Sequence, residues 1–161
     1  MQQPPPTVDD VLLQLCELGV NLPHGKVRVD GYGDSDALSK ELLALIRSGQ
    51  KRAGTGLVWL YEHDNEPLPE VGDIEVVIDH LGQPSVVTRI VSVKVLPYGQ
   101  VTAEYAAIEG EGDGSLKYWR EAHWSYFTRA CQRIGREPSE SMQVACSVFE
   151  VLNVLPENAA A

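Results

Sequence analysis

Three polar residues in separate parts of the chain could act together in a hydrolytic reaction. Lys51 and Thr55 lie in the segment GQKRAGTG, and Glu109 begins the glycine-rich acidic segment EGEGDGS. A lysine or a threonine can serve as nucleophile or base, and a carboxylate can carry the proton between groups. The glycines, Gly54 among them, leave the main chain open to an anion or a planar ligand. If the fold brings the three side chains together, these residue types suit hydrolysis.

The lysine segment also has a purely structural interpretation. Lys51 and Arg52 follow the expected end of a helix, where cations interact favourably with the negative end of the helix dipole. The glycines of the same segment would then only make a tight connection. Spacing alone favours this interpretation, so the catalytic hypothesis needs support from other residues.

The acidic segment could bind a metal ion. Glu109, Glu111 and Asp113 could supply oxygen ligands to Mg²⁺ or Mn²⁺, or one of them could act as a general base. Their spacing matches no calcium-binding loop, and acidic glycine-rich segments are commonly solvated turns. We therefore expect no cofactor, with a bound divalent cation as the alternative.

Aromatic and basic residues are concentrated in one segment with helical spacing. They are Tyr118, Trp119, Arg120, His123, Trp124, Tyr126 and Phe127. Aromatic side chains are mostly core residues, but this set covers more than one face of a helix, so some members must face solvent or line a cavity. Tyr118, Arg120 and His123 could stack on a base or contact phosphate, as in proteins that bind single strands. Arg52 and Trp59, close to the lysine segment, are further candidate RNA contacts.

A helix followed by a turn and a strand should position the lysine segment. Ser35 is suited to cap this helix, and apolar residues then recur at helical spacing at Leu38, Leu42, Leu45 and Ile46. Gly49 is placed for a left-handed C-cap. The apolar residues 57–61, which follow the turn, predict a strand.

The remaining patterns predict an α+β fold, with a mostly antiparallel sheet that closes into a small β-barrel with flanking helices. Helices are expected at residues 8–18, 102–107 and 115–134, and strands at 27–29, 74–78, 86–95 and 143–155. Residues 8–155 are expected to form a single domain. The proline-rich residues 1–7 are expected to be disordered, and residues 156–161 to be frayed.

Composition predicts a soluble globular protein in the cytoplasm. Of the 161 residues, 43% are hydrophobic and 22% are charged, no apolar run reaches membrane-spanning length, and the first residues do not resemble a secretory signal. The net charge of −10 disfavours bulk electrostatic binding of nucleic acid, so any such contact must be local. Cys16, Cys131 and Cys146 are predicted to be buried free thiols, because their number and separation do not suit a disulfide framework or a zinc site.

Three stretches, in matching order, resemble the ASCH domain family. They are GDSDALSKELLALIRSGQKRAGTGLVWLYE, PLPEVGD and EYAAIEGEGDGSLKYWREAHWSYF, and the similarity extends over residues 27–152. The resemblance implies a PUA-like β-barrel with flanking helices. It also implies an association with RNA, because members include RNA-binding modules, ribonucleases that act on single strands, and short amidohydrolases that deacylate N4-acetylcytidine.

The family's signature, G-x-K-[TR]-x-T, is matched at Gly49, Lys51 and Arg52. Its threonine position is occupied by Gly54, and Thr55 is displaced by one residue. In the short amidohydrolases the lysine, that threonine and a later glutamate form the site, so the resemblance implies roles for Lys51 and Glu109. Thr55 could replace the missing threonine after a small shift; otherwise activity would be weakened or absent.

Our leading hypothesis is a hydrolase that acts on single-stranded RNA. A basic groove near Lys51, Arg52 and Arg120 would hold the RNA backbone, aromatic side chains would stack on bases, and Lys51 would stabilise charge on the phosphate. The first alternative is amidohydrolysis of an N4-acetylcytidine-type modified nucleoside, and the second is a non-catalytic module that binds RNA or a modified nucleotide. No membrane partner is expected. The chain lacks the nucleophile elbow, phosphate-loop and dinucleotide-binding motifs.

Overall fold

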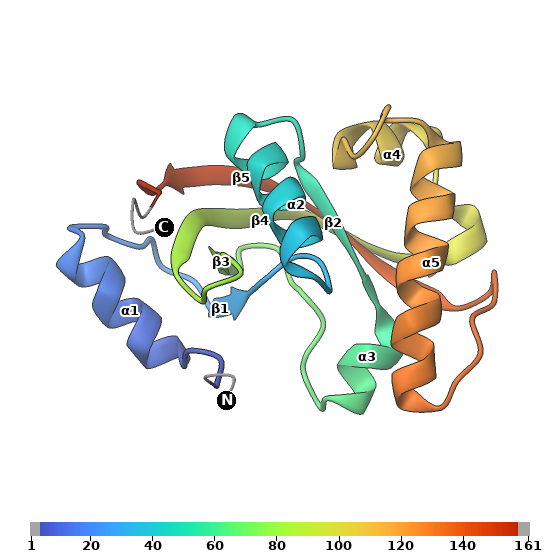
Figure 1. Ribbon diagram of the computed structural model, residues 1–161, viewed down its shortest axis with the longest axis horizontal. Coiled ribbons are helices and arrows are strands. Elements are labelled where there is room, and N and C mark those ends of the chain that lie inside the picture. Colours follow the sequence, from blue (N-terminus) through green and yellow to red (C-terminus); the bar gives the residue numbers. More distant parts are fainter. Residues whose placement is uncertain (1–3, 158–161) are drawn as a thin grey trace.

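One curved sheet forms the centre of the protein, whose computed structural model describes residues 4–157. The strands run in the order β1 (Val27–Asp30), β3 (Ile74–Ile78), β4 (Pro84–Pro97), β5 (Gln143–Val154) and β2 (Ala53–Leu57) (Figure 1). Strands β1 and β3 pair in parallel, whereas the other three pairings are antiparallel. The sheet is therefore mixed.

The predicted α+β class is confirmed, but the prediction of a closed barrel is wrong. Within residues 4–157, β1 and β2 are the two edges of an open sheet and do not pair with each other. A pocket, described below, is lined by residues from both edge strands and lies between them. The space that would close a barrel is used to form a cavity.

Helices cover the ends and one side of this sheet. They are α1 (Val8–Glu17), α2 (Asp36–Ser48), α3 (Val58–His63), α4 (Ala103–Glu109), α5 (Leu116–Ile134) and the short 3-10 helix η1 (Tyr98–Gln100). The predicted ends of α2 are confirmed: Ser35 Oγ accepts a bond from the Leu38 N–H at 3.2 Å, and Gly49 is left-handed with φ of 85°.

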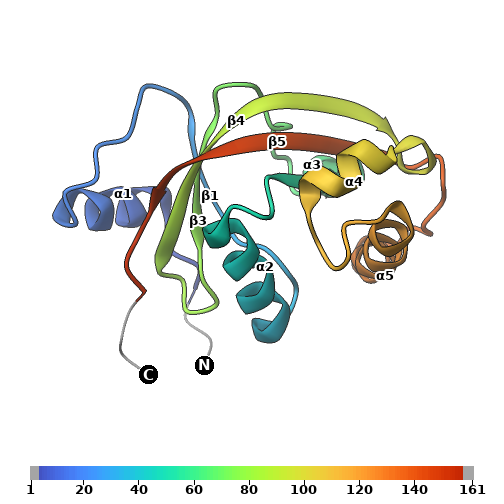
Figure 2. The same cartoon turned by 90° about the horizontal axis from the view of Figure 1, so that it is seen from above.

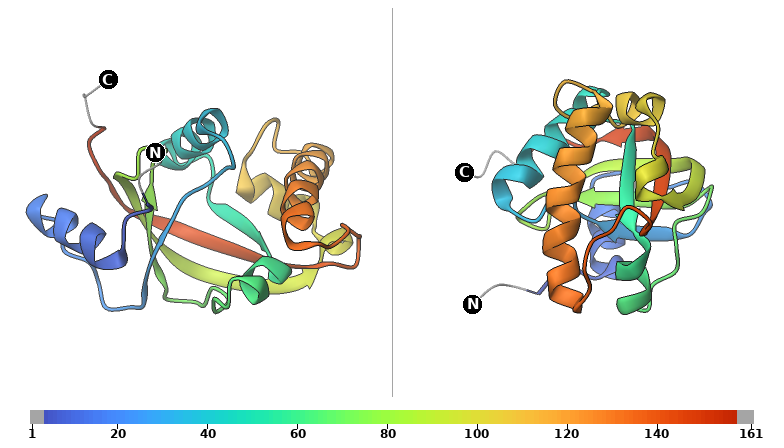
Figure 3. Two further views of the ribbon diagram at one scale, coloured as in Figure 1. Left: turned by 60° about the horizontal axis from the view of Figure 1, so that its bottom comes forward. Right: turned by 90° about the vertical axis from the view of Figure 1, so that its right-hand side faces the viewer.

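The long strands β4 and β5 connect two ends of the molecule. Figure 2 shows α1 at one end and α5 at the other, with α2 and α5 on the same side of the sheet. Separate apolar cores hold these helices, around Val11 and Leu15 in α1, Ile46 in α2, and Trp119 and Phe127 in α5. In Figure 3, β2 lies between α2 and α5. Because each helix is fixed by its own core, the space between them remains open over β2.

The strand predicted at residues 57–61 is wrong in position. Residues 53–57 form β2, and the chain then turns directly into α3. Glycine is unfavourable in strands, but here a Cβ at Gly54 would lie 3.0 Å from the Tyr32 hydroxyl, and a Cβ at Gly56 would lie 2.5 Å from that of Tyr61. Tyr32 and Tyr61 therefore pack directly against the backbone of β2. These contacts account for two glycines in a strand, where local propensity indicates a turn.

Two of the three cysteine predictions are confirmed. Cys131 and Cys146 are buried free thiols, whereas Cys16 is exposed on the side of α1 opposite the buried Val11 and Leu15. None of the helices within residues 4–157 has the length and apolar character needed to cross a membrane. Residues 1–3 and 158–161, which belong to the predicted disordered and frayed ends, lie outside the described residues. The division into one domain and the cytoplasmic location stay predictions.

Candidate functional site

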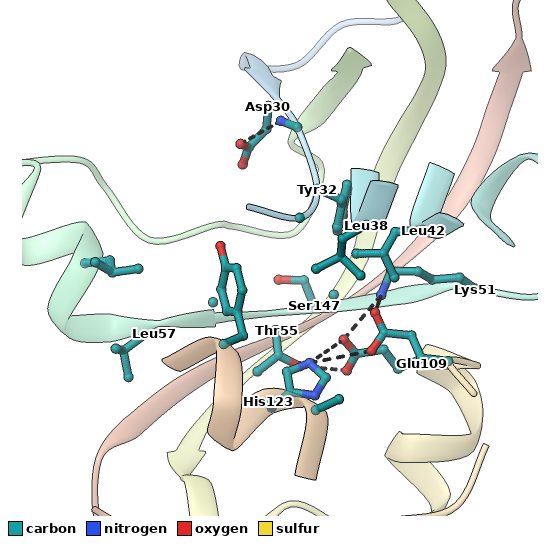
Figure 4. A pocket seen from close by; sticks show the side chains of 18 of the residues that line it. Asp30, Tyr32, Leu38, Leu42, Lys51, Thr55, Leu57, Glu109, His123 and Ser147 are labelled. Carbon is teal, nitrogen blue, oxygen red and sulfur yellow. Dashed lines mark hydrogen bonds and ion pairs between the residues drawn. The ribbon is translucent and has the colours of Figure 1, made fainter. Parts of the chain in front are cut away.

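A pocket of about 290 Å³ lies between the two edges of the sheet (Figure 4). Its walls come from β2, from α2 and α5, and from the end of β1 together with α3. Lys51 and Thr55, which are close in sequence, and the distant Glu109 all line it. The structure thus brings the three predicted catalytic residues to one cavity.

Glu109 is at the centre of a hydrogen-bond network below the pocket. Its Oε1 accepts bonds from Lys51 Nζ at 3.2 Å and from His123 Nε2 at 2.9 Å. Its Oε2 accepts bonds from Thr55 Oγ1 at 2.8 Å and from Trp119 Nε1 at 2.6 Å. A carboxylate has about four acceptor sites, so this side chain, which is 1% exposed, is fully satisfied.

Lys51 is equally buried and uses all of its donors. Its Nζ donates to the Ala53 carbonyl oxygen at 2.8 Å and lies 3.2 Å from Glu109 Oε1 and 3.3 Å from Glu111 Oε1. The Tyr32 ring lies on another side, with its centroid 5.3 Å from Nζ. The ammonium group therefore fills the space between two carboxylates.

Electrostatic interactions oppose the effect of burial on the pKa values of Glu109 and His123. Burial alone would raise the pKa of Glu109, but the charges of Lys51 and His123 and the bonds from His123 and Trp119 lower it to about 2. Burial would lower the pKa of His123, but the charge of Glu109 and the hydrogen bond to it raise that pKa above its ordinary value. Its Nδ1 donates to the Trp119 carbonyl oxygen, 2.8 Å away. The charged forms of Glu109 and His123 thus stabilise each other, and Lys51 also stabilises the carboxylate.

Backbone contacts between two segments set this geometry. The Lys51 N–H donates to the Leu45 carbonyl at 3.0 Å, which caps the end of α2. The Arg52 N–H donates to the Ile108 carbonyl at 3.0 Å, and Gln50 Nε2 donates to the Gly110 carbonyl at 2.9 Å. The end of α2 and the end of α4 are therefore joined, and this contact places the lysine beside the glutamate.

Thr55 reaches the site from β2, not from a flexible turn. Its residue pairs with Cys146 of β5, and its Oγ1 lies 3.0 Å from the hydroxyl of Tyr105, which also donates to the Gly54 carbonyl at 2.8 Å. The displacement by one residue in sequence does not remove the threonine hydroxyl from the site. Its catalytic role stays a prediction.

The groups that could hold a metal ion are already neutralised. Ligand atoms of Glu109, Glu111 and His123 lie within 4.8 Å of one another. However, Lys51 occupies the position of a cation between the two carboxylates, and both ring nitrogens of His123 are bonded, to the Trp119 carbonyl oxygen and to Glu109. Asp113 is not in this group, and its Oδ1 instead accepts a bond from the Ser115 N–H at 2.9 Å. As arranged, these residues do not suit a divalent ion.

Comparison with known proteins identifies the family. The family model described as the ASCH domain matches residues 29–153. The chain belongs to the ASCH domain family. This family is generally associated with RNA binding, and its fold is PUA-like.

Two solved structures resemble this ASCH domain over most of its length. The ASCH domain from Lactobacillus crispatus JV V101 is 36% identical, with a TM-score of 0.73, over 78% of this chain and 79% of that one. The protein EF3133 from Enterococcus faecalis V583 is 25% identical, with a TM-score of 0.76, over 92% of this chain and 91% of that one. The comparison with curated proteins gave no match.

Some of the predicted RNA contacts of this ASCH domain line the pocket, and others lie away from it. Gly54, Tyr118 and His123 line the pocket. Three do not: Arg52 is exposed, Trp59 packs under the Arg136 guanidinium, and Arg120 contacts the Gly99 carbonyl oxygen. Of the three cations expected to form a basic groove, Lys51, Arg52 and Arg120, only the lysine lines the cavity. Linear sequence does not specify the direction in which each side chain points.

Several residues of the hydrogen-bond network and of the pocket in this ASCH domain were not predicted from sequence. Tyr105 lies one helical turn before Glu109, a spacing that places both on one face of α4 and could have identified it. Trp119, expected only as a core residue, also donates to Glu109. Tyr32, in the segment after β1, and Glu75 of β3 line the cavity, and no motif marks them.

Proposed function

We propose that this ASCH domain is an amidohydrolase that removes the acyl group from an N4-acetylcytidine-type compound. The observation that carries the proposal is the bond from the Thr55 hydroxyl to Glu109, the carboxylate that also holds Lys51, on the wall of a cavity. A hydroxyl bonded to a carboxylate beside a cation suits nucleophilic acyl transfer. The pocket volume of about 290 Å³ is at the small end of the usual range for ligand sites.

In this mechanism Thr55 Oγ1 attacks the acyl carbonyl carbon, and the new C–O bond forms as the hydroxyl proton leaves toward Glu109. The amide C–N bond then breaks, and the proton passes to the leaving nitrogen. Water next hydrolyses the threonine ester, which releases the carboxylic acid and restores the hydroxyl. Because the pKa of Glu109 is held at about 2, it is a weak base, and its main role at rest is to orient the hydroxyl.

Lys51 stabilises the oxyanion of the tetrahedral intermediate. All three of its donors are occupied at rest, so one must be exchanged. The Glu111 carboxylate is the partner that leaves, because it is only partly buried and lies between Gly110 and Gly112, both left-handed. An ammonium placed at developing negative charge in a shielded site is a strong source of catalysis.

Hydrolysis of RNA has less support from this geometry. Phosphoryl chemistry depends on cations aimed at the phosphate oxygens. Among the pocket-lining residues the cations are Lys51 and His123: both ring nitrogens of His123 are already bonded, and a single donor of Lys51 can be released for a ligand. Arg52 and Arg120 do not line the cavity. We therefore propose that the substrate is a nucleoside derived from RNA, which is consistent with the family's association with RNA.

The test compares two substrates in parallel. Purified wild type, Lys51→Met and Glu109→Gln are incubated with N4-acetylcytidine and with single-stranded RNA, and acetate, cytidine and RNA fragments are measured. We expect acetate and cytidine from wild type only, with no RNA fragments that depend on Lys51. Glu121→Gln, an exposed position on α5, is the matched control and keeps wild-type turnover. Tight binding of N4-acetylcytidine without acetate release would instead identify a binding module.

A further inference from the structure

The mouth of the pocket is surrounded by carboxylates. Four exposed acidic residues line the cavity, and together we call them the acidic rim: Asp30, Glu41, Asp64 and Glu66. They come from the end of β1, from α2 and from the segment that follows α3. Figure 4 shows Asp30 on the far side of the pocket from His123. This member of the rim therefore lies away from the proposed chemistry.

The interior of the pocket does not offset this negative charge. Three further carboxyl groups line it, those of Glu75, Glu109 and Glu111. The positive charge of Lys51 is taken up by two of them, and both ring nitrogens of His123 are already bonded, to Trp119 and Glu109. A ligand that enters finds many acceptors and no free cation among the lining residues.

Two neighbouring arginines make their contacts outside the cavity. Arg129 binds Asp34 with an Nε–Oδ2 distance of 2.6 Å, and Arg28 donates to the Pro67 carbonyl at 2.7 Å and lies 3.7 Å from Asp73. Neither arginine lines the cavity. Neither arginine therefore supplies a phosphate clamp at the cavity, a role that arginine and lysine side chains often fill in proteins.

We infer that the acidic rim excludes phosphate, so that the substrates are free nucleosides and not nucleotides or RNA. This inference rests on the proposed amidohydrolase function, and it names the substrate class. With the acyl amide at Thr55, the sugar extends toward the rim. A 5′-phosphate carries nearly two negative charges and would be repelled by four carboxylates. Sugar hydroxyls, in contrast, can donate hydrogen bonds to the same oxygens.

The first test needs only wild-type protein. We expect kcat/KM for N4-acetylcytidine to exceed that for its 5′-monophosphate by about 30-fold at low ionic strength, since several exposed carboxylates act together. In about 0.5 M salt, where the Debye length falls below about 5 Å, the ratio should fall to about threefold. A ratio near one at low salt, or a ratio that salt does not change, would overturn the inference.

The second test removes the negative charge of the acidic rim. The quadruple variant Asp30→Asn, Glu41→Gln, Asp64→Asn and Glu66→Gln should reduce the low-salt ratio about tenfold. The matched control changes the same number of charges at exposed residues that do not line the pocket: Asp9→Asn, Glu17→Gln, Glu137→Gln and Glu140→Gln. It should keep the wild-type ratio, and equal effects of the two variants would contradict a role for the rim. If the quadruple rim variant fails to fold, the pair Asp64→Asn and Glu66→Gln should give an intermediate ratio.

Failure of the proposed function can be separated from failure of this inference. Calorimetric titration with cytidine and with cytidine 5′-monophosphate measures selectivity without turnover. If wild type releases no acetate but binds cytidine in preference to the monophosphate, the proposed function fails and the rim's role stands. If it binds the monophosphate better, or binds neither compound, the inference fails.

Discussion

Glu109 is a buried carboxylate with a hydrogen-bond donor on every side. Two of those donors, Lys51 and His123, carry positive charge. Such a group is costly to bury and is stable only as part of the complete network. Sequence reasoning found Lys51 and Glu109 through the family resemblance, but the charges and hydrogen bonds around them depend on the fold.

Removal of the Glu109 charge should destabilise the protein. Glu109→Gln leaves Lys51 and His123 with less compensation, and we expect the free energy of unfolding to fall by about 3 kcal/mol. Urea unfolding at pH 7 measures this change. Glu121→Gln, which is exposed on α5, should stay within about 0.5 kcal/mol of wild type. A loss for Glu109→Gln no larger than that of the control would show that the network does not stabilise the fold.

Glu75 should make stability depend on pH. Burial, and then the nearby charge of Asp30, raise its pKa to about 7 from an ordinary value of 4.5. The folded state therefore binds this proton more tightly, and the resulting stability is fully present below pH 4.5 and is lost as pH rises through about 7. Relative to Glu75→Gln, wild type should lose on the order of 2 kcal/mol between pH 5 and pH 8. A difference between the two proteins that is constant with pH would contradict this assignment.

At the scale of elements, the contact between the ends of α2 and α4 decides whether the site forms. Helix ends were predictable because Ser35, Thr102, Ser115 and the glycines that follow the helices are local signals. Strand β2 was not predictable, because its two glycines are explained by contacts with Tyr32, from a distant segment, and with Tyr61 of the following helix α3. Local patterns predict where elements start and stop, whereas packing between elements decides their type when propensity is weak.

Gly110 tests the α2–α4 contact. It is left-handed with φ of 69°, and a Cβ there would overlap the carbonyl oxygen of Gln50. Gly114 is also left-handed, with φ of 76°, but has open space around it. Gly110→Ala should therefore lower the free energy of unfolding by about 2 kcal/mol more than Gly114→Ala and reduce turnover, because it forces Glu109 away from Lys51. Equal losses in urea unfolding would show that the close approach at Gly110 is unimportant.

At the scale of the whole molecule, the open sheet is what makes a cavity. The prediction of an α+β ASCH fold was correct, but closure into a barrel was not, since β1 and β2 each contribute a wall of the pocket instead of pairing. The distribution of charge over the molecule also could not be predicted from the sequence. A net charge of −10 is visible in the composition, but its concentration at one mouth depends on three separate segments. Because negative charge is concentrated at the pocket, a small nucleoside is a better candidate substrate than RNA.

The central claim is that Thr55, placed by β2 against Glu109, is the nucleophile of an amidohydrolase. Acetate release from N4-acetylcytidine by wild type, Thr55→Ser and Thr55→Val tests it most directly, with circular dichroism to verify folding. Valine has the shape of threonine without the hydroxyl, so kcat/KM should fall at least about 1,000-fold, whereas serine should retain measurable turnover. Folded Thr55→Val that releases acetate at the wild-type rate would contradict the account.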